Sequence, residues 1–422
     1  MPLHQLPGEV WLHVLSYLSV ADKHSVRATC KYFKQFVDCG LLWKDWTIIL
    51  GFPKGSYSRQ FWETLRRRKI NHVVVRSTKE KDLKQLARGL PSITSLVMDI
   101  NSQESLGYLK YFPQLTHLAV RYSSNSLLLD ASTVCEPEKM THLSICRVEF
   151  PSKSRQRLDF VFQDFVNLTS LVCHDTGISA PYILTVILCR LPRLKHLSLT
   201  CGSGVKGQRV PASFPGEATL GLSSLELIHC DHLLLRETMK LLPNLQTLVL
   251  VYMYSVYDVP SQLQLTASED MKTWLSGLHH LSTLVIKLGP RVHSYVRFIP
   301  VSVSRLTLRV PGLNSGEFAS VASQVPNLLH LHVDTWPTHL GTLAAEIPQL
   351  FPKLQSLKVR GEHVSEEDFL GFQKMADLRY VEMLDSSPQS SKVAAKLQML
   401  TNYRLHVTMS HQRDILECHC SY

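Results

Sequence analysis

The hydrophobic positions of the chain follow one short pattern that returns many times. The pattern reads apolar, x, x, Leu, x, x, Leu, x, apolar, and "LPNLQTLVL" is a clear copy. Its last residues alternate between apolar and polar, which is typical of a short β-strand with one buried face. Clear copies lie at 112–120, 165–173, 191–199, 242–250, 278–286, 325–333 and 351–359, and weaker ones at 70–75, 90–98, 138–145, 221–227, 302–308, 375–383 and 402–407.

The copies recur about every 25 residues, which resembles the period of leucine-rich repeats. Helical spacing in 181–191, 231–242 and 366–375 predicts return helices, and Ser365 with Asp368 is a capping pair for the last. Because one unit cannot bury its own apolar edge, the units must stack. The sequence predicts an α/β fold, a curved leucine-rich-repeat solenoid with parallel strands on the concave face and helices or loops on the convex face.

Two boundaries between repeats are irregular. The segment 202–219 is rich in Gly and Pro and predicts a loop, and 251–270 lengthens its interval and begins with aromatic and Met residues. Loops held by a rigid scaffold often carry function. Tyr252 and Tyr254 are therefore candidate substrate-binding residues, with packing against neighbouring repeats as the alternative.

The N-terminal segment has a helical period instead. Two apolar stripes are separated by a break near Ser19–Asp22. A unit of about 40 residues is marginally stable alone, so exposed apolar residues on it make sense if another chain covers them. The alternative is a helical cap that shields the first repeat. The apolar positions are Val10, Trp11, Val14, Leu15 and Leu18, then Val26, Cys30, Phe33 and Val37, then Leu41, Leu42 and Trp43.

The order of landmarks in this segment resembles the F-box. With the repeats, the whole chain resembles F-box proteins with leucine-rich repeats. The resemblance implies an F-box at 1–46, a linker helix at 47–69, and about 12–14 irregular repeats in 70–422. The landmarks are Leu6-Pro7, Glu9, Tyr17-Leu18, Asp22, the run Val26-Arg27-x-x-Cys30-Lys31-x-Phe33, and Leu42-Trp43-Lys44.

Members of that family dock through the F-box onto the adaptor Skp1, which joins them to a cullin scaffold and a RING subunit. Their repeats hold a substrate for ubiquitin transfer. The resemblance therefore implies a non-catalytic substrate-recognition subunit of an SCF-type ubiquitin ligase. Two alternatives are a repeat scaffold that binds proteins without ubiquitin transfer, and a receptor for a small ligand on the concave face. Carried over by position, the Skp1-binding residues are Leu6, Pro7, Val10, Leu15, Leu18 and Trp43.

Candidate binding residues lie on the expected concave face of the strands. His117 and His142 should be adjacent there, as a shared metal site or, in the ordinary interpretation, as polar rungs; no further ligand is aligned, and we expect no metal. Basic residues gather in the last third, where they predict binding of an acidic or phosphorylated segment, with scattered solvated charge as the alternative. The members of this basic strip are Lys287, Arg305, Arg309, Lys358 and Arg360, with His330 and His332 between them.

Composition narrows the class of protein. The formal net charge of +10 favours acidic partners, and nothing indicates nucleic-acid binding clearly. We expect the ten cysteines to be reduced thiols of a cytoplasmic or nuclear protein, because they lack the spacing of a disulfide scaffold. No apolar run approaches the roughly 20 residues that span a bilayer, and no secretory signal is visible. No phosphate loop, nucleophile elbow or cofactor motif is found.

Overall fold

A computed structural model describes residues 6–44, 46–52, 56–76, 79–99, 106–123, 134–148, 164–174, 190–201, 221–230, 239, 242–252, 271–310, 312–335, 340–361, 363–384 and 388–410. The chain forms two compact units, residues 1–177 with 420–422 and residues 178–419. Among the described residues, no helix is both long enough and apolar enough to cross a membrane.

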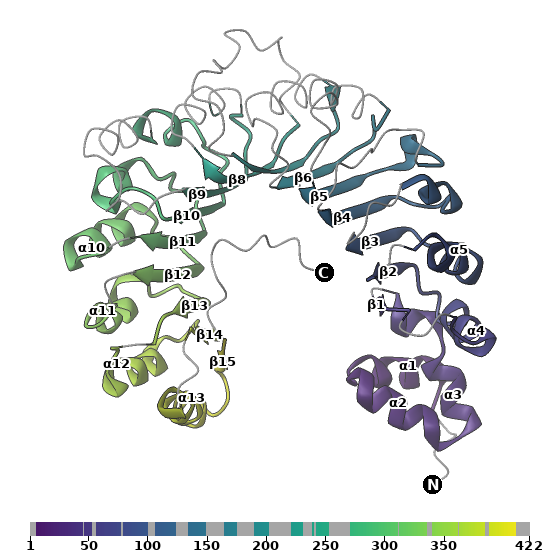
Figure 1. The fold of residues 1–422 in the computed structure, drawn as a ribbon. Coiled ribbons are helices and arrows are strands. Elements are labelled where there is room, and N and C mark those ends of the chain that lie inside the picture. Colours follow the sequence, from purple (N-terminus) through teal and green to yellow (C-terminus); the bar gives the residue numbers. More distant parts are fainter. Residues whose placement is uncertain are drawn as a thin grey trace. The chain divides into compact units, whose positions relative to one another are not determined.

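The first unit begins with short helices and continues as a parallel sheet whose strands follow in sequence order (Figure 1). Hydroxyl caps start two of its helices, because Ser19 accepts from the backbone N–H of Asp22 and Ser58 from that of Phe61. Its elements are α1 (Gly8–Ser16), α2 (Val20–Thr29), α3 (Lys31–Val37), η2 (Gly40–Trp43), β1 (Thr47–Leu50), α4 (Arg59–Arg67), β2 (His72–Val75), α5 (Glu80–Gly89), β3 (Ser95–Asp99), η3 (Leu106–Tyr111), β4 (His117–Ser123), η5 (Pro137–Lys139), β5 (His142–Val148) and β6 (Ser170–His174).

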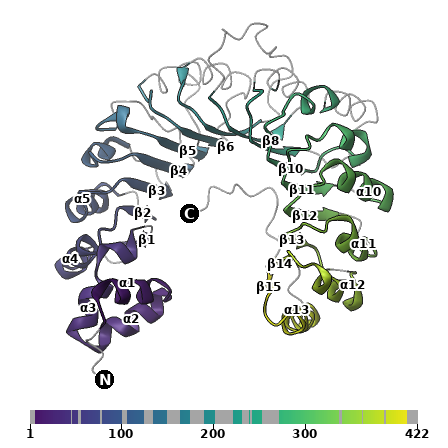
Figure 2. The same ribbon diagram turned by 180° about the vertical axis from the view of Figure 1, so that it is seen from behind.

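The second unit has the same alternation of strands and return segments (Figure 2). Asn314 and Glu317 form a capping box at α10, and the predicted cap of Ser365 on Asp368 is present at α12. Its elements are β7 (His196–Thr200), β8 (Ser224–Cys230), β9 (Thr247–Tyr252), β10 (Thr283–Lys287), η7 (Val292–Ser294), η8 (Val296–Phe298), β11 (Arg305–Val310), α10 (Ser315–Gln324), β12 (His330–Thr335), α11 (Leu343–Leu350), β13 (Ser356–Val359), α12 (Glu366–Leu370), η9 (Gly371–Lys374), β14 (Tyr380–Met383), α13 (Pro388–Leu400) and β15 (His406–Met409).

The repeated leucines form the core of each unit. In the second unit Leu284, Leu306, Leu331 and Leu357 are in register on neighbouring strands, and all are buried. Burying one such side chain stabilises the fold by about 1.5–3 kcal/mol. The leucines face α10, α11 and α12, which line one side of β11–β14 in Figure 1. The alternate strand residues point the other way, onto what we call the open face.

The predicted α/β repeat fold is confirmed, with one difference at its start. We expected a linker helix over 47–69, but this segment holds β1 as well as α4. Thr47 to Leu50 pair in parallel with His72 to Val75, because "TIIL" has β-branched residues that extend the sheet by one strand. The expected helices at 181–191 and 231–242 and the loop at 202–219 lie almost entirely outside the described residues.

Candidate functional site

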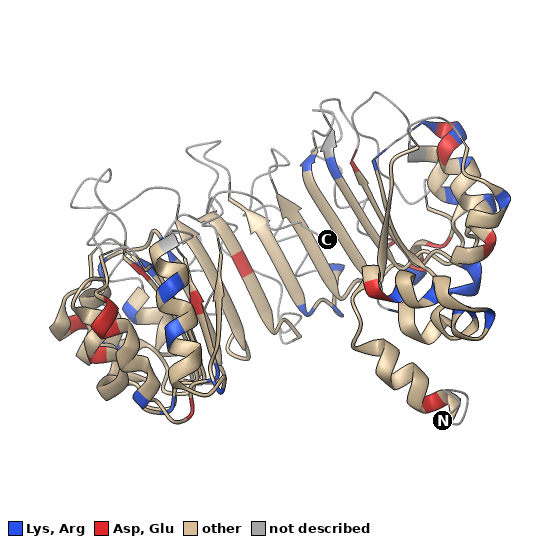
Figure 3. Cartoon of the chain, turned by 90° about the horizontal axis from the view of Figure 1, so that it is seen from below, with Lys and Arg blue, Asp and Glu red and all other residues tan. Residues whose placement is uncertain are grey.

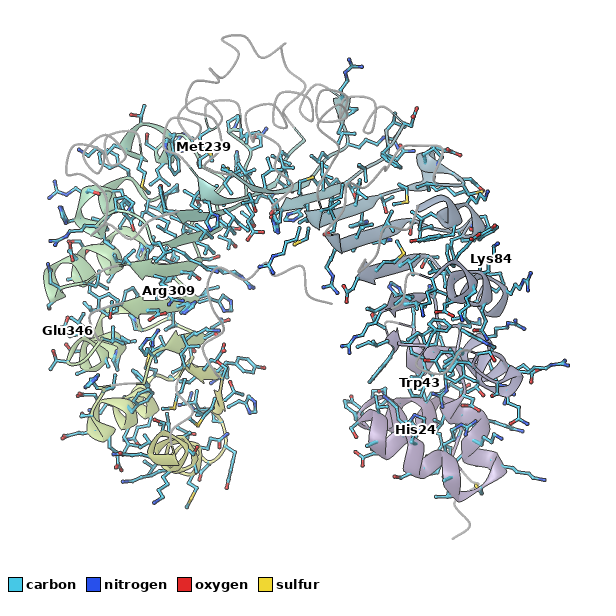
Figure 4. The ribbon with its side chains drawn as sticks, viewed as in Figure 1. His24, Trp43, Lys84, Met239, Arg309 and Glu346 are labelled. Atoms are coloured by element: carbon cyan, nitrogen blue, oxygen red, sulfur yellow. The ribbon has the colours of Figure 1, made fainter. Side chains whose placement is uncertain are left out.

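Buried aromatic and aliphatic side chains hold the N-terminal helices together. Leu15, Val37 and Trp43 are all at most 4% exposed, and Trp43 is labelled within this helical segment in Figure 4. The indole N–H of Trp43 donates a hydrogen bond to the backbone carbonyl of Val37. This bond satisfies a polar group that would otherwise be costly to bury.

A buried carboxylate connects these helices to α4. Asp38 accepts two hydrogen bonds from Arg27, at 2.8 and 2.9 Å, and one from Arg68 at 3.1 Å. Burial alone would raise the pKa of Asp38, but the bonds from Arg27 and Arg68 outweigh it and hold that pKa below its usual range. We call Asp38, Arg27 and Arg68 the arginine clamp. Since Arg68 directly follows α4, the clamp fixes that helix against the N-terminal segment.

The exposed side of α1 presents apolar residues. Val10, Val14 and Tyr17 are three or four residues apart, so they lie on one face of α1, and Leu6 is an exposed apolar residue just before the helix. Leu41 belongs to η2, which packs against α1. We call these five residues the apolar stripe. Their exposed fractions are 46% for Leu6, 40% for Val10, 44% for Val14, 77% for Tyr17 and 72% for Leu41.

The predicted Skp1-binding residues divide into two groups. Leu6, Pro7 and Val10 are exposed and Leu18 is half-buried. Leu15 and Trp43 are 2% and 4% exposed, so in the free chain they offer little surface to a partner, and their contact with Skp1 stays a prediction. Val14, Tyr17 and Leu41 are exposed as well, although the predicted Skp1-binding set does not contain them. The i, i+4, i+7 spacing of Val10, Val14 and Tyr17 is the sequence signal that identifies this face.

The basic strip of the second unit is largely neutralised by its own acids. Asp334 is 1% exposed and pairs with both Arg309, at 3.2 Å, and Arg360, at 2.9 Å. Figure 4 labels Arg309 at the strands, away from Glu346 on α11. A buried carboxylate on the strand between them therefore holds both Arg309 and Arg360, and their binding of an acidic segment stays a prediction.

Most other members of the strip are ion-paired, partly buried or uncharged. Lys358 pairs with Glu382 at 2.8 Å, and Lys287 is half-buried, which lowers the pKa of its ammonium. Burial also lowers the pKa of His330, and it lowers the pKa of His332 to about 4, so both rings are neutral at pH 7. Arg305 alone among the strip's lysines and arginines is exposed, and no described residue is its ion-pair partner. Most charged residues in Figure 3 accordingly lie on helices and at strand ends.

The two candidate tyrosines do not form a described surface. Tyr252 is buried, and its hydroxyl donates to the sulfur of Met271 at 3.4 Å. The alternative interpretation of packing between repeats is therefore confirmed for Tyr252, and its assignment to substrate binding was wrong. Tyr254 lies outside the described residues.

A groove lies on the open face of β10–β15. It is a shallow, solvent-open depression of ≈ 480 Å³ within the second unit. Arg305 lies toward one end, Lys358 and Glu382 lie in the middle, and His406 lies toward the other end, following the order of the strands. The other lining residues are Thr283, Leu306, Thr307, His330, Leu331, His332, Ser356, Tyr380, Val381 and Thr408.

The adjacent histidines of the first unit are a stacked pair, as the register predicts. The rings of His117 and His142 lie 3.9 Å apart at 12°, and each Nδ1 is hydrogen-bonded to the threonine that precedes it. Burial, and then the neighbouring His142, lowers the pKa of His117 to about 4. Among the described residues, no group of three or more His, Cys, Asp or Glu side chains is placed to hold a metal ion.

The comparison with solved structures found matches of low sequence identity. A chain of the TLR13–ssRNA13 complex is 17% identical over 85% of this chain and 53% of that chain, with a TM-score of 0.41. A chain of the yeast Rad7–Elc1 complex is 15% identical over 87% and 86%, at 0.47, and a chain of the mouse RP105/MD-1 complex is 16% identical over 87% and 67%, at 0.40. This chain thus spans about half the length of the TLR13 chain.

The family comparison concerns the N-terminal helices. No curated protein sequence matches the chain. Residues 3–48 match the F-box-like family, and this range contains the apolar stripe, Asp38 and Trp43. The chain is therefore a protein with an F-box-like domain at its N-terminus, followed by a leucine-rich-repeat fold.

Proposed function

We propose that this protein is the substrate-recognition subunit of an SCF-type ubiquitin ligase. Its F-box-like domain binds the adaptor Skp1, and through it a cullin and a RING subunit. The repeats hold the protein that receives ubiquitin. The chain supplies no chemistry of its own and acts by proximity, because a tethered substrate meets the ubiquitin donor at a raised effective concentration. The proposal places the complex in the cytoplasm or nucleus.

The observation that carries the proposal is the apolar stripe within the family match. Leu6, Val10 and Val14 expose 40–46% of their surface to solvent, although other apolar residues of the same domain, such as Leu15, are buried. If this segment only capped the first repeat, we would expect such residues to be buried, as Leu15 is. Helix faces of this kind are recognised by grooves on a partner through side chains at i, i+3, i+4 and i+7 spacing, and Val10, Val14 and Tyr17 follow it.

The arginine clamp supports the same function. A substrate receptor must hold its two binding surfaces at a defined separation if the substrate is to reach the donor. The clamp joins α4, which precedes β2 of the first unit's sheet, to α2 and the end of α3, and α3 in turn packs against α1, which carries most of the apolar stripe. A scaffold that binds partners without ubiquitin transfer has no such need for a rigid connection.

The test is co-purification of Skp1 with the full chain, followed by reconstituted ubiquitin transfer. The informative variant is Val10→Asp with Val14→Asp, which places charge on the apolar stripe without opening the core. Val301→Asp is the matched control, since Val301 is 64% exposed in the second unit. We expect the double variant to lose Skp1 and the control to retain it.

Two results would reject the proposal. A wild-type chain that fails to bind Skp1 would favour the scaffold alternative. A double variant that binds Skp1 as tightly as the wild type would show that the apolar stripe is not the docking surface. Trp43→Ala is a poor test of docking, because the loss of a buried indole would destabilise the domain.

A further inference from the structure

We infer that the groove on β10–β15 binds an extended, unphosphorylated peptide segment that places one Asp or Glu carboxylate on Arg305. The same segment places an apolar or aromatic side chain against Tyr380, about four residues along. The inference rests on the proposed function, since it names the class of segment that the repeats would recognise. It is narrower than the acidic or phosphorylated partner predicted from the basic strip.

The charge of the groove supports a single carboxylate. Its arginine, lysine and acidic lining residues are Arg305, Lys358 and Glu382. Lys358 and Glu382 neutralise each other at 2.8 Å, and Glu382 also accepts a hydrogen bond from Ser410. One positive charge therefore remains in the groove, on the exposed guanidinium of Arg305. A guanidinium matches one carboxylate with two parallel hydrogen bonds.

The same charges disfavour phosphate. A phosphoryl group carries a charge of about −1.5 to −2 and is usually held by a cluster of arginines. The arginines that would complete such a cluster, Arg309 and Arg360, are buried on Asp334. Lys287 is half-buried and does not line the groove.

The strand register sets the length of the segment. Arg305, His330, Ser356 and Tyr380 are successive partners on β11, β12, β13 and β14. Three strand spacings are about 14 Å, which is the length of about four extended residues. Tyr380 is 60% exposed and its ring lies 6.2 Å from that of His406, so an apolar face is available at this distance from Arg305.

The experiment measures fluorescence anisotropy of dye-labelled heptapeptide pools with the purified full chain. Position two is fixed as Glu, Gln, Lys or phosphoserine, position six is Phe, and the other positions are mixed uncharged residues. We expect the Glu pool to bind about two- to fivefold more tightly than the Gln pool, the usual effect of one solvent-exposed ion pair. The phosphoserine pool should bind no more tightly than the Glu pool.

Variants of Arg305 test the contact itself. Arg305→Gln should abolish the preference for Glu over Gln, and Arg305→Glu should invert the preference toward the Lys pool. The matched control is Arg297→Glu, because Arg297 is an exposed arginine of η8, outside the groove. It should keep the wild-type preference.

Three outcomes would overturn the inference. They are equal binding of the Glu and Gln pools, an unchanged preference in Arg305→Gln, and tighter binding of the phosphoserine pool. Skp1 co-purification is measured on the same preparations. Normal Skp1 binding with any of these three outcomes would reject the peptide assignment and leave the proposed function intact.

Discussion

The guanidinium of Arg68 lies over the ring of Trp43, with its central carbon 4.0 Å from the ring centroid. Arg68 follows α4 and Trp43 ends η2, so this contact joins the helix that leads into the repeats to the F-box-like domain. Because Arg68 also donates to Asp38, the aromatic ring and the carboxylate hold one side chain from two directions. Such cation–π contacts contribute about 0.5–2 kcal/mol, more when the cation is desolvated.

Removing the charge of the clamp should destabilise the first unit. In Asp38→Asn three arginines, Arg27, Arg67 and Arg68, lose a shared buried carboxylate. Breaking a buried ion pair from one side costs about 3–5 kcal/mol. Urea denaturation followed by tryptophan fluorescence measures the change in unfolding free energy. Glu63→Gln is the control, since Glu63 pairs with Arg59 at the surface and should change stability by about 0.5 kcal/mol or less. Equal stability of Asp38→Asn and wild type would show that the clamp does not hold the unit together.

The stacked histidines should make stability depend on pH. His117 has a pKa of about 4 in the folded chain, because burial and His142 oppose its charge, whereas the unfolded chain protonates near 6.5. As the pH falls from 6.5 to 4, the unfolded state therefore binds more protons and folding stability falls; above 6.5 the ring contributes no pH dependence. His117→Gln should show a smaller loss of urea midpoint between pH 7 and pH 5 than the wild type.

The control for this titration is His279→Gln, an exposed histidine of the second unit. Its midpoints should follow those of the wild type at each pH. A direct measurement is the NMR titration of the His117 ring. A midpoint at or above 6.5 would contradict the lowered pKa of His117.

Neighbouring residues of α1 should separate folding from docking. Leu15→Ala removes a side chain that is 2% exposed and should cost about 2–5 kcal/mol of unfolding free energy. Val14→Ala removes a half-exposed side chain next to it and should change stability little, while it weakens Skp1 binding. Thermal denaturation and Skp1 titration of the two variants make the comparison. If Val14→Ala unfolded the domain and Leu15→Ala left its stability unchanged, the assignment of Leu15 to the core and Val14 to the docking surface would be contradicted.

Much of the fold follows from the spacing of leucines. The pair Leu306 and Leu331 shows why, since the template places both on the buried face and the parallel register aligns them. A register shift of one residue would move the leucines of a strand from the buried face to the exposed face, so the period-2 pattern strongly constrains the register. The early strand β1 was missed because it carries no copy of the leucine template.

The binding surfaces followed less directly from the sequence. On α1 an offset of one residue separates exposed Val14 from buried Leu15, and apolar character is the same for both. On the second unit, Arg305 and Arg309 share a face of β11, but only Arg309 meets Asp334 of the next repeat. Whether a basic residue is free depends on such contacts between residues about 25 positions apart, which local patterns do not encode.

The most direct test of the central claim is hydrogen–deuterium exchange of the full chain with and without purified Skp1. The account predicts slower exchange over α1 and η2, the elements that carry the apolar stripe, and unchanged exchange over β10–β15. Unchanged exchange over α1 at saturating Skp1, or protection confined to the repeats, would contradict it.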